Sequence, residues 1–249
     1  MHALVSRASI LGMNAFTIFA ERAPIKLTVS HLTMLHGFGI FDDYWKVELL
    51  DGELWGVPAD GDWEPESDAT FPVKLTTDHY QLLDRAGAFL EHHKTELLDG
   101  RVYDVSPQYR PHGFVKDEFA YRLRRALEAL GSSLHVATEQ SVVLERFSEP
   151  IPDIILTTEP IGTGAIPGHS VGLLLEIADS SSKSDRVRKA SLYARASIPE
   201  YWIADVNKRV VLRMWAPDRG FYGQRDKVQF GQQVGSATID GLVIATADL

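Results

Sequence analysis

The chain has 249 residues, 45% of them hydrophobic and 24% charged, and its composition is that of a soluble globular protein with one large core, with or without an appendage. It contains no cysteine, which excludes disulfides and thiolate metal sites, so any metal must be bound by oxygen or histidine ligands. The formal net charge of −9 argues against a generic nucleic-acid binder, but residues 1–70 carry −7 of that charge and residues 71–249 only −2.

The first apolar segment runs from Ala8 to Ala20. It is too short to span a bilayer and is interrupted by Asn14. Only Arg7 stands before it as a nearby cation, and no clear cleavage site follows, which argues against a signal peptide. We expect a docked element or an extension, no membrane association and a cytoplasmic location.

An internal repeat follows. Residues 25–57 align without a gap to residues 73–105 at a constant offset of 48, and 14 of the 33 positions are identical. Each copy predicts a short helix with a Thr, Ser or Asp cap, then a hairpin around an Asp-Gly turn. The acidic, proline-containing segment 58–72 predicts a boundary, so we expect an N-terminal extension over residues 1–70 and a main domain over residues 71–249.

The next predicted element is a helix from about Phe114 to Leu130, where apolar residues recur at helical spacing. His112 stands just before this segment. A histidine at a helix start serves either packing or a polar site, and the sequence leaves both open.

Two acidic residues stand at the ends of predicted strands. Asp153 opens an apolar, β-branched run that ends at Thr158, and Glu176 closes the run 171–177 after a loop rich in glycine and proline. Antiparallel pairing of these strands would bring the two carboxylates to about 5 Å. Such a pair is tolerated when a cation lies between the acids or when one is protonated, and Mg²⁺ prefers carboxylate oxygens. The simpler alternative is two acids that end their strands in water.

A helix of about twelve residues is predicted between Glu176 and the strand YWIADV, with Ser184 and Asp185 at its start. Lys189 falls just inside this helix, where its long side chain can reach back toward the acid pair. Two acids and a lysine around a cation suit phosphodiester hydrolysis, because the ammonium balances charge that develops on the phosphate.

Seven motifs occur in a fixed order from the second repeat copy onward: ELLDG at 96–100, SPQYRPH at 106–112, Pro152-Asp153, EIADSSSKSD at 176–185, Lys189, Tyr193 and IPEYWIADV at 198–206. Together they resemble the Uma2 family of restriction endonucleases, within the PD-(D/E)XK nuclease superfamily, from about Val73 to the C-terminus. The resemblance implies an α/β (α+β) fold: a restriction-endonuclease-like mixed central sheet flanked by helices. The N-terminal copy would then be a partial duplication of the helix-hairpin unit.

The same resemblance implies a site. Glu96, Asp153 and Glu176 would bind Mg²⁺ or Mn²⁺, and Lys189 would be the catalytic lysine. It also implies a role for His112 near the substrate phosphate or behind the metal-binding acids.

Tyr193 one turn beyond Lys189 would orient that lysine, with packing as the equal alternative. Glu48 occupies the place equivalent to Glu96 in the first copy, but only the second copy runs on into SPQYRPH, which favours Glu96.

Two departures from the superfamily pattern concern the segment after Glu176. The usual lysine two residues later is replaced by Ala178, so Lys189 must supply the charge. The stretch Asp179-Ser180-Ser181 stands where the family has a Ser-Pro-Ser-like turn.

We therefore expect a metal-dependent endonuclease that acts on DNA, with a homodimer as one option because cutting both strands suits a symmetric dimer. The main alternative is a catalytically silent protein that keeps the fold as an interaction or regulatory module. An esterase built on Ser180 and Lys183 would need companion motifs that the sequence lacks.

Overall fold

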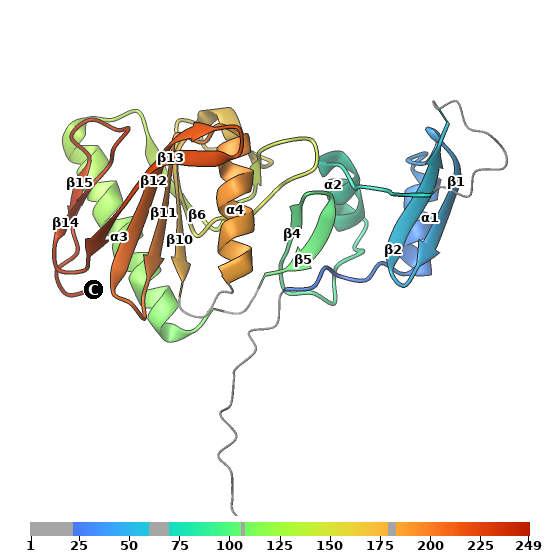
Figure 1. Cartoon of the computed structure of the whole chain (residues 1–249), viewed down its shortest axis with the longest axis horizontal. Coiled ribbons are helices and arrows are strands. Elements are labelled where there is room, and N and C mark those ends of the chain that lie inside the picture. The colour runs from blue at the N-terminus through green and yellow to red at the C-terminus, as the bar shows by residue number, and fades with distance from the viewer. Residues whose placement is uncertain (1–21, 60–69, 106–107, 179–182) are drawn as a thin grey trace, which may run out of the picture.

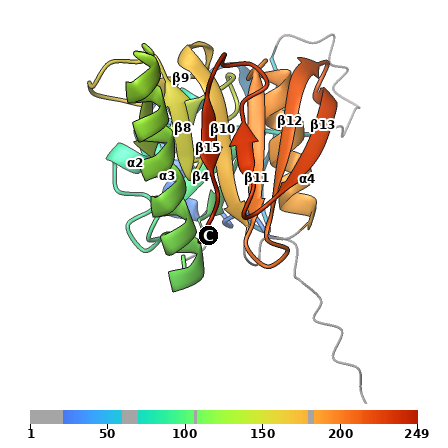
Figure 2. The ribbon, with the colours of Figure 1, turned by 90° about the vertical axis from the view of Figure 1, so that its left-hand side faces the viewer.

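The computed structural model describes residues 22–59, 70–105, 108–178 and 183–249. Its centre is a six-stranded mixed sheet in which only β10 and β11 are parallel, as Figures 1 and 2 show. In sheet order the strands are β13 (Phe221–Gln229), β12 (Val210–Asp218), β11 (Glu200–Asp205), β10 (Val171–Ala178), β8 (Ile154–Thr157) and β6 (His135–Thr138).

Helices cover both faces of this sheet. On one face, α3 (Arg110–Leu130) packs over Leu173 and Leu175, and on the other, α4 (Lys183–Arg195) packs over Leu174. The alternation follows from the period of two in a strand, which sends successive side chains of β10 to opposite faces. The structure thus confirms the predicted mixed sheet flanked by helices.

The two repeat copies form equivalent helix-hairpin units. The first has α1 (Val29–Gly37), β1 (Tyr44–Leu50) and β2 (Glu53–Pro58), and the second has α2 (Thr77–Arg85), β4 (Thr95–Leu98) and β5 (Arg101–Asp104). Thr28 and Thr76 cap the two helices, as predicted. Both Asp-Gly turns have positive φ at both residues, 48° and 82° in the first copy and 51° and 82° in the second, which is why glycine is required there.

The two units share one hydrophobic core. Residues of the first copy such as Leu35 and Leu54 pack with Leu75, Leu83 and Leu97 from the second. The division at residue 70 stays a prediction. Six smaller elements complete the described part of the chain: β3 (Phe71–Pro72) beside β2, the parallel pair β7 (Val142–Val143) and β9 (Ile166–Pro167), the 3-10 turn Gly168–Ser170, and the hairpin of β14 (Gln233–Gly235) and β15 (Val243–Ala245) beside α3.

The predicted antiparallel pairing around the acid pair is confirmed: Ile154 of β8 lies opposite Leu175 of β10. The predicted start of α3 was wrong, because the helix begins at Arg110 and includes His112. Pro111 explains the earlier start, since proline fits the first turn of a helix, where its missing N–H costs nothing.

The apolar segment from Ala8 to Ala20 lies outside the described residues. Within the described part of the chain, none of the helices combines the length and the apolar character that crossing a membrane requires.

Candidate active site

Glu176 lies on β10, on the face of the sheet that α4 covers. Lys189 Nζ lies 3.0 Å from Glu176 Oε1, and the hydroxyl of Tyr193 donates to the same oxygen at 2.8 Å. The lysine and the tyrosine are four residues apart, so they share one face of α4. One turn of α4 thus supplies both polar partners of the acid.

Glu96 reaches the same lysine from the β4 strand. Its side chain is 1% exposed, and its Oε2 accepts the N–H of Ile151 at 3.1 Å and lies 3.4 Å from Lys189 Nζ. Its other oxygen, Oε1, accepts from Arg22 Nη1 at 2.5 Å. The ammonium of Lys189 therefore bridges Glu96 and Glu176.

Asp153 is the residue immediately before β8, and its side chain accepts a hydrogen bond from β10 at the end of the β8–β10 pairing. Its Oδ2 accepts the N–H of Ile177 at 2.7 Å. Its Oδ1 lies 3.0 Å from both Gln108 Nε2 and His112 Nε2. The bond to Ile177, next to Glu176 in the chain, ties this acid to the Glu176 strand.

Burial and neighbouring charges shift the proton affinities in this region. Burial, together with the negative charges of Asp153 and Glu96, raises the pKa of Glu176 to about 7, and Lys189 only partly opposes the rise. Burial would also raise the pKa of Glu96, but Lys189 and Arg22 outweigh it and hold this pKa below its usual value.

The pKa of Lys189 is set by burial and by the same two acids. Burial alone would lower the pKa of Lys189, but Glu176 and Glu96 raise it above its usual range. Lys189 is therefore a fixed cation at neutral pH, whereas Glu176 is the acid whose ionisation is costly.

The fit of this site to a metal ion can be judged from its charges. No group of three or more histidine, aspartate or glutamate side chains among the described residues could hold a metal ion as it stands. Lys189 and Arg22 explain this, because both contact Glu96. Asp153 and Glu176 nevertheless offer two carboxylates, because Asp153 is bonded to the backbone of Ile177 beside Glu176, and carboxylate oxygens are the ligands that Mg²⁺ prefers. The role of Glu96 as a metal ligand stays a prediction.

The structure brings most predicted site residues together. Glu96, Glu176, Lys189 and Tyr193 form one contact network, and His112 supports Asp153 beside it.

Glu48, the alternative to Glu96, forms its ion pair elsewhere. It pairs with Lys46 at 2.8 Å and is 39% exposed. Ser180, with the turn around it, lies outside the described residues.

Four residues of the site were missed by sequence reasoning. Gln108 lay within the SPQYRPH motif and Arg188 next to Lys189, so both could have been found. The ring of Tyr103 has the guanidinium carbons of Arg22 and Arg188 at 5.4 and 5.0 Å from its centroid. Arg22 had no sequence feature that pointed to the site.

Other cations of α4 stabilise the fold. Arg186 pairs with Asp205 at 3.1 Å, and Arg195 pairs with Asp99 at 2.5 Å. The cationic character of this helix is therefore only partly available to a phosphate backbone.

The mixed sheet between α3 and α4, with acids and a lysine meeting at β10, defines a restriction-endonuclease-like protein. A model of the Uma2 family, described as "Putative restriction endonuclease", matches residues 77–247, and the chain belongs to this family.

A solved relative has the same fold. It is a crystal structure described as a "putative nuclease belonging to DUF820" from Anabaena variabilis ATCC 29413, with a TM-score of 0.50 and 11% identity. The similarity covers 65% of this chain and 89% of that one. The comparison with curated proteins gives no match.

Proposed function

We propose that this protein is a metal-dependent endonuclease that hydrolyses DNA phosphodiester bonds through Glu96, Asp153, Glu176 and Lys189. The observation that carries the proposal is the buried ammonium of Lys189, which lies 3.0 Å from Glu176 and 3.4 Å from Glu96. A fixed cation that contacts two acids is suited to a reaction that moves negative charge onto phosphate oxygens.

The division of labour follows from the contacts. Asp153 and Glu176 would hold Mg²⁺ or Mn²⁺, with Glu96 as a further candidate ligand, and the ion would supply Lewis acidity and an activated water. Lys189 would stabilise negative charge on the phosphate, because its raised pKa keeps it protonated.

The remaining polar residues position the acids. Tyr193 fixes one oxygen of Glu176, and Gln108 and His112 fix one oxygen of Asp153. His112 would act on the substrate through Asp153, because its Nε2 faces the carboxylate of that acid. DNA as the substrate is supported by the family description. The homodimer and the cytoplasmic location stay predictions.

One observation favours the alternative of a catalytically silent module. Arg22 and Lys189 both contact Glu96, so two cations already neutralise the acid that a metal would otherwise share. A protein that used the fold only for interaction would tolerate this arrangement.

Cleavage of single- and double-stranded DNA by the full chain, with Mg²⁺, with Mn²⁺ and with EDTA, separates the two functions. We expect cleavage only with metal and a loss of about a hundredfold or more in Asp153→Ala and Lys189→Ala. The matched controls Asp218→Ala and Lys227→Ala remove exposed charges and should leave the rate unchanged. Undiminished cleavage in both site variants would show that the site is wrong, and no cleavage by the wild-type chain would favour the silent module.

A further inference from the structure

The two repeat copies pack against each other through reciprocal contacts. The N–H of Ile25 donates to the carbonyl of Val102 at 2.7 Å, and the N–H of Val73 donates to the carbonyl of Leu54 at 2.8 Å. At the offset of 48, Val73 is the equivalent of Ile25 and Leu54 is the equivalent of Val102. The second bond is therefore the first one repeated, as in the interface of a two-fold symmetric dimer.

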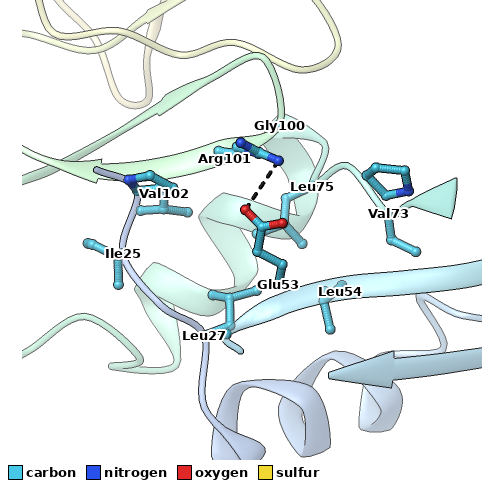
Figure 3. A pocket seen from close by; sticks show the side chains of 12 residues that line it. Ile25, Leu27, Glu53, Leu54, Val73, Leu75, Gly100, Arg101 and Val102 are labelled. Carbon is cyan, nitrogen blue, oxygen red and sulfur yellow. Dashed lines mark ion pairs between the residues drawn. The ribbon is translucent and has the colours of Figure 1, made fainter. Parts of the chain in front are cut away.

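An ion pair marks the centre of this interface. Arg101 Nη2 lies 3.2 Å from Glu53 Oε1, and these two residues are also equivalent at the offset of 48 (Figure 3). The pocket around them is lined by six equivalent pairs: Pro24 and Pro72, Ile25 and Val73, Leu27 and Leu75, Gly52 and Gly100, Glu53 and Arg101, Leu54 and Val102. The first copy thus docks on the second as a second subunit would.

This docking fixes the position of Arg22, three residues before Ile25. Ile25 bonds to Val102, whose neighbour Tyr103 lies opposite Glu96 in the β4–β5 hairpin. In Figure 1 the described chain starts beside this hairpin and then runs away to α1. Arg22 therefore reaches Glu96 because the first copy holds the backbone next to it.

The guanidinium of Arg22 has hydrogen-bonding capacity left over. One nitrogen, Nη1, bonds to Glu96, but Nε and Nη2 are buried and have no hydrogen-bond partner among the described residues. Buried N–H groups without acceptors cost free energy, and the planar fork of arginine matches two oxygens of a phosphate. The two nitrogens thus have the chemistry of a phosphate-binding group next to Lys189.

We propose that Arg22 binds the scissile phosphodiester and that the first repeat copy holds Arg22 in position for this contact. The inference rests on the proposed nuclease function and deepens it. Arg22 lies outside residues 77–247 and three residues before Ile25, so the contribution comes from the segment that leads into the first copy and not from the segment that the family model matches.

Binding of labelled oligonucleotides by the full chain without metal, measured by fluorescence anisotropy over a range of salt concentrations, tests the contact. Arg22→Ala should weaken binding about tenfold and reduce the slope of log K against log salt by roughly 0.7 to 0.9, which is the loss of one phosphate contact. Arg22→Lys keeps the charge and should keep the slope while binding more weakly. Lys26→Ala, which removes an exposed cation paired with Asp51 in the same copy, is the control and should change neither quantity.

The role of the first copy in positioning Arg22 is tested at the ion pair between Glu53 and Arg101. Glu53→Arg places two cations opposite each other and should reproduce the Arg22→Ala defect although Arg22 is intact. Glu53→Arg with Arg101→Glu restores an ion pair with reversed charges and should restore binding.

The outcomes separate this inference from the nuclease function. Cleavage by the wild-type chain, with unchanged affinity and salt slope in Arg22→Ala, overturns the role of Arg22 and leaves the nuclease intact. Binding that depends on Arg22, without any cleavage, supports a contact of Arg22 with a backbone phosphate and overturns the nuclease function, and with it the scissile character of that phosphate. Folding of each variant is checked by circular dichroism. If Arg22→Ala is misfolded, the Arg22→Lys variant decides. Unchanged affinity of Arg22→Lys contradicts the proposal, whereas weaker binding with an unchanged salt slope supports it.

Discussion

Lys189 Nζ lies 3.0 Å from Glu176 Oε1, although one residue is on α4 and the other on β10. Ala178, two residues after the acid, belongs to the same buried hydrophobic cluster as Leu192 and Tyr193 of α4. A lysine side chain at position 178 would clash with α4. The small alanine lets α4 pack closely enough for Lys189 to reach Glu176. The small residue and the displaced lysine are thus two parts of one arrangement.

Replacement of this lysine should cost stability as well as activity. Lys189→Met leaves Glu96 and Glu176 buried without their shared cation, which we expect to destabilise the fold by about 3–5 kcal/mol. Urea denaturation measures this free energy of unfolding. Lys227→Met at an exposed position is the control and should change it by less than about 0.5 kcal/mol. Equal stability of the two variants would contradict the buried bridge.

The internal repeat offers a matched pair of acids for a second prediction. Glu96→Gln removes the charge that faces Lys189 and Arg22 and should abolish cleavage, whereas Glu48→Gln changes the equivalent residue, which is 39% exposed and paired with Lys46. We expect Glu48→Gln to cleave DNA at the wild-type rate and to lose at most about 1 kcal/mol of stability. Similar losses of cleavage in the two variants would show that the first copy also carries a functional acid.

Local patterns were enough to predict much of the fold. The Asp-Gly turns need positive φ at both residues, and the apolar runs around Asp153 and Glu176 pair as expected, so hairpins and strands followed from short segments. The reach of Lys189 to the acids also followed, because helix geometry constrains the direction of a side chain in the second turn of α4.

Contacts between distant segments could not be predicted in this way. Arg22 meets Glu96 across 74 residues, and only the docking of the two copies brings them together. Residue type was ambiguous as well: Glu200 is a buried strand acid like Glu176, but it accepts hydrogen bonds from Trp202 and from the segment around Ser236, and so holds the fold together. A sequence cannot distinguish a carboxylate that is satisfied by donors from one that is strained by other acids.

The hydroxyl of Tyr193 provides a third prediction. Tyr193→Phe removes only the 2.8 Å bond to Glu176, and Tyr222→Phe removes a comparable 3.1 Å bond to the carbonyl of Ile198 outside the site. Both variants should lose about 0.5–1.5 kcal/mol of stability, measured by thermal unfolding. Only Tyr193→Phe should also slow DNA cleavage, because only it frees the Glu176 carboxylate to rotate. Equal cleavage rates in the two variants would leave Tyr193 with a packing role alone.

A buried acid outside the site gives a pH-dependent prediction. Glu149 is 4% exposed, and burial, with the nearby charges of Asp84 and Asp78, raises its pKa above the ordinary value of 4.5 despite the hydrogen bond from Gln81. The folded protein therefore holds this proton more tightly than the unfolded chain does. The stabilisation from Glu149 is complete below about pH 4.5 and is lost as the pH rises through the raised folded value.

Glu149→Gln removes the ionisation and keeps an oxygen that can accept from Gln81. The variant should be more stable than the wild-type chain at pH 8, and this gain should shrink toward zero as the pH falls to 4 and the wild-type carboxyl takes up its proton. Urea denaturation at several pH values measures the difference, with Glu128→Gln at an exposed position of α3 as the control. A variant that is less stable than the wild type at pH 8 would mean that the carboxylate is held by donors stronger than Gln81, and so that its charge stabilises the fold.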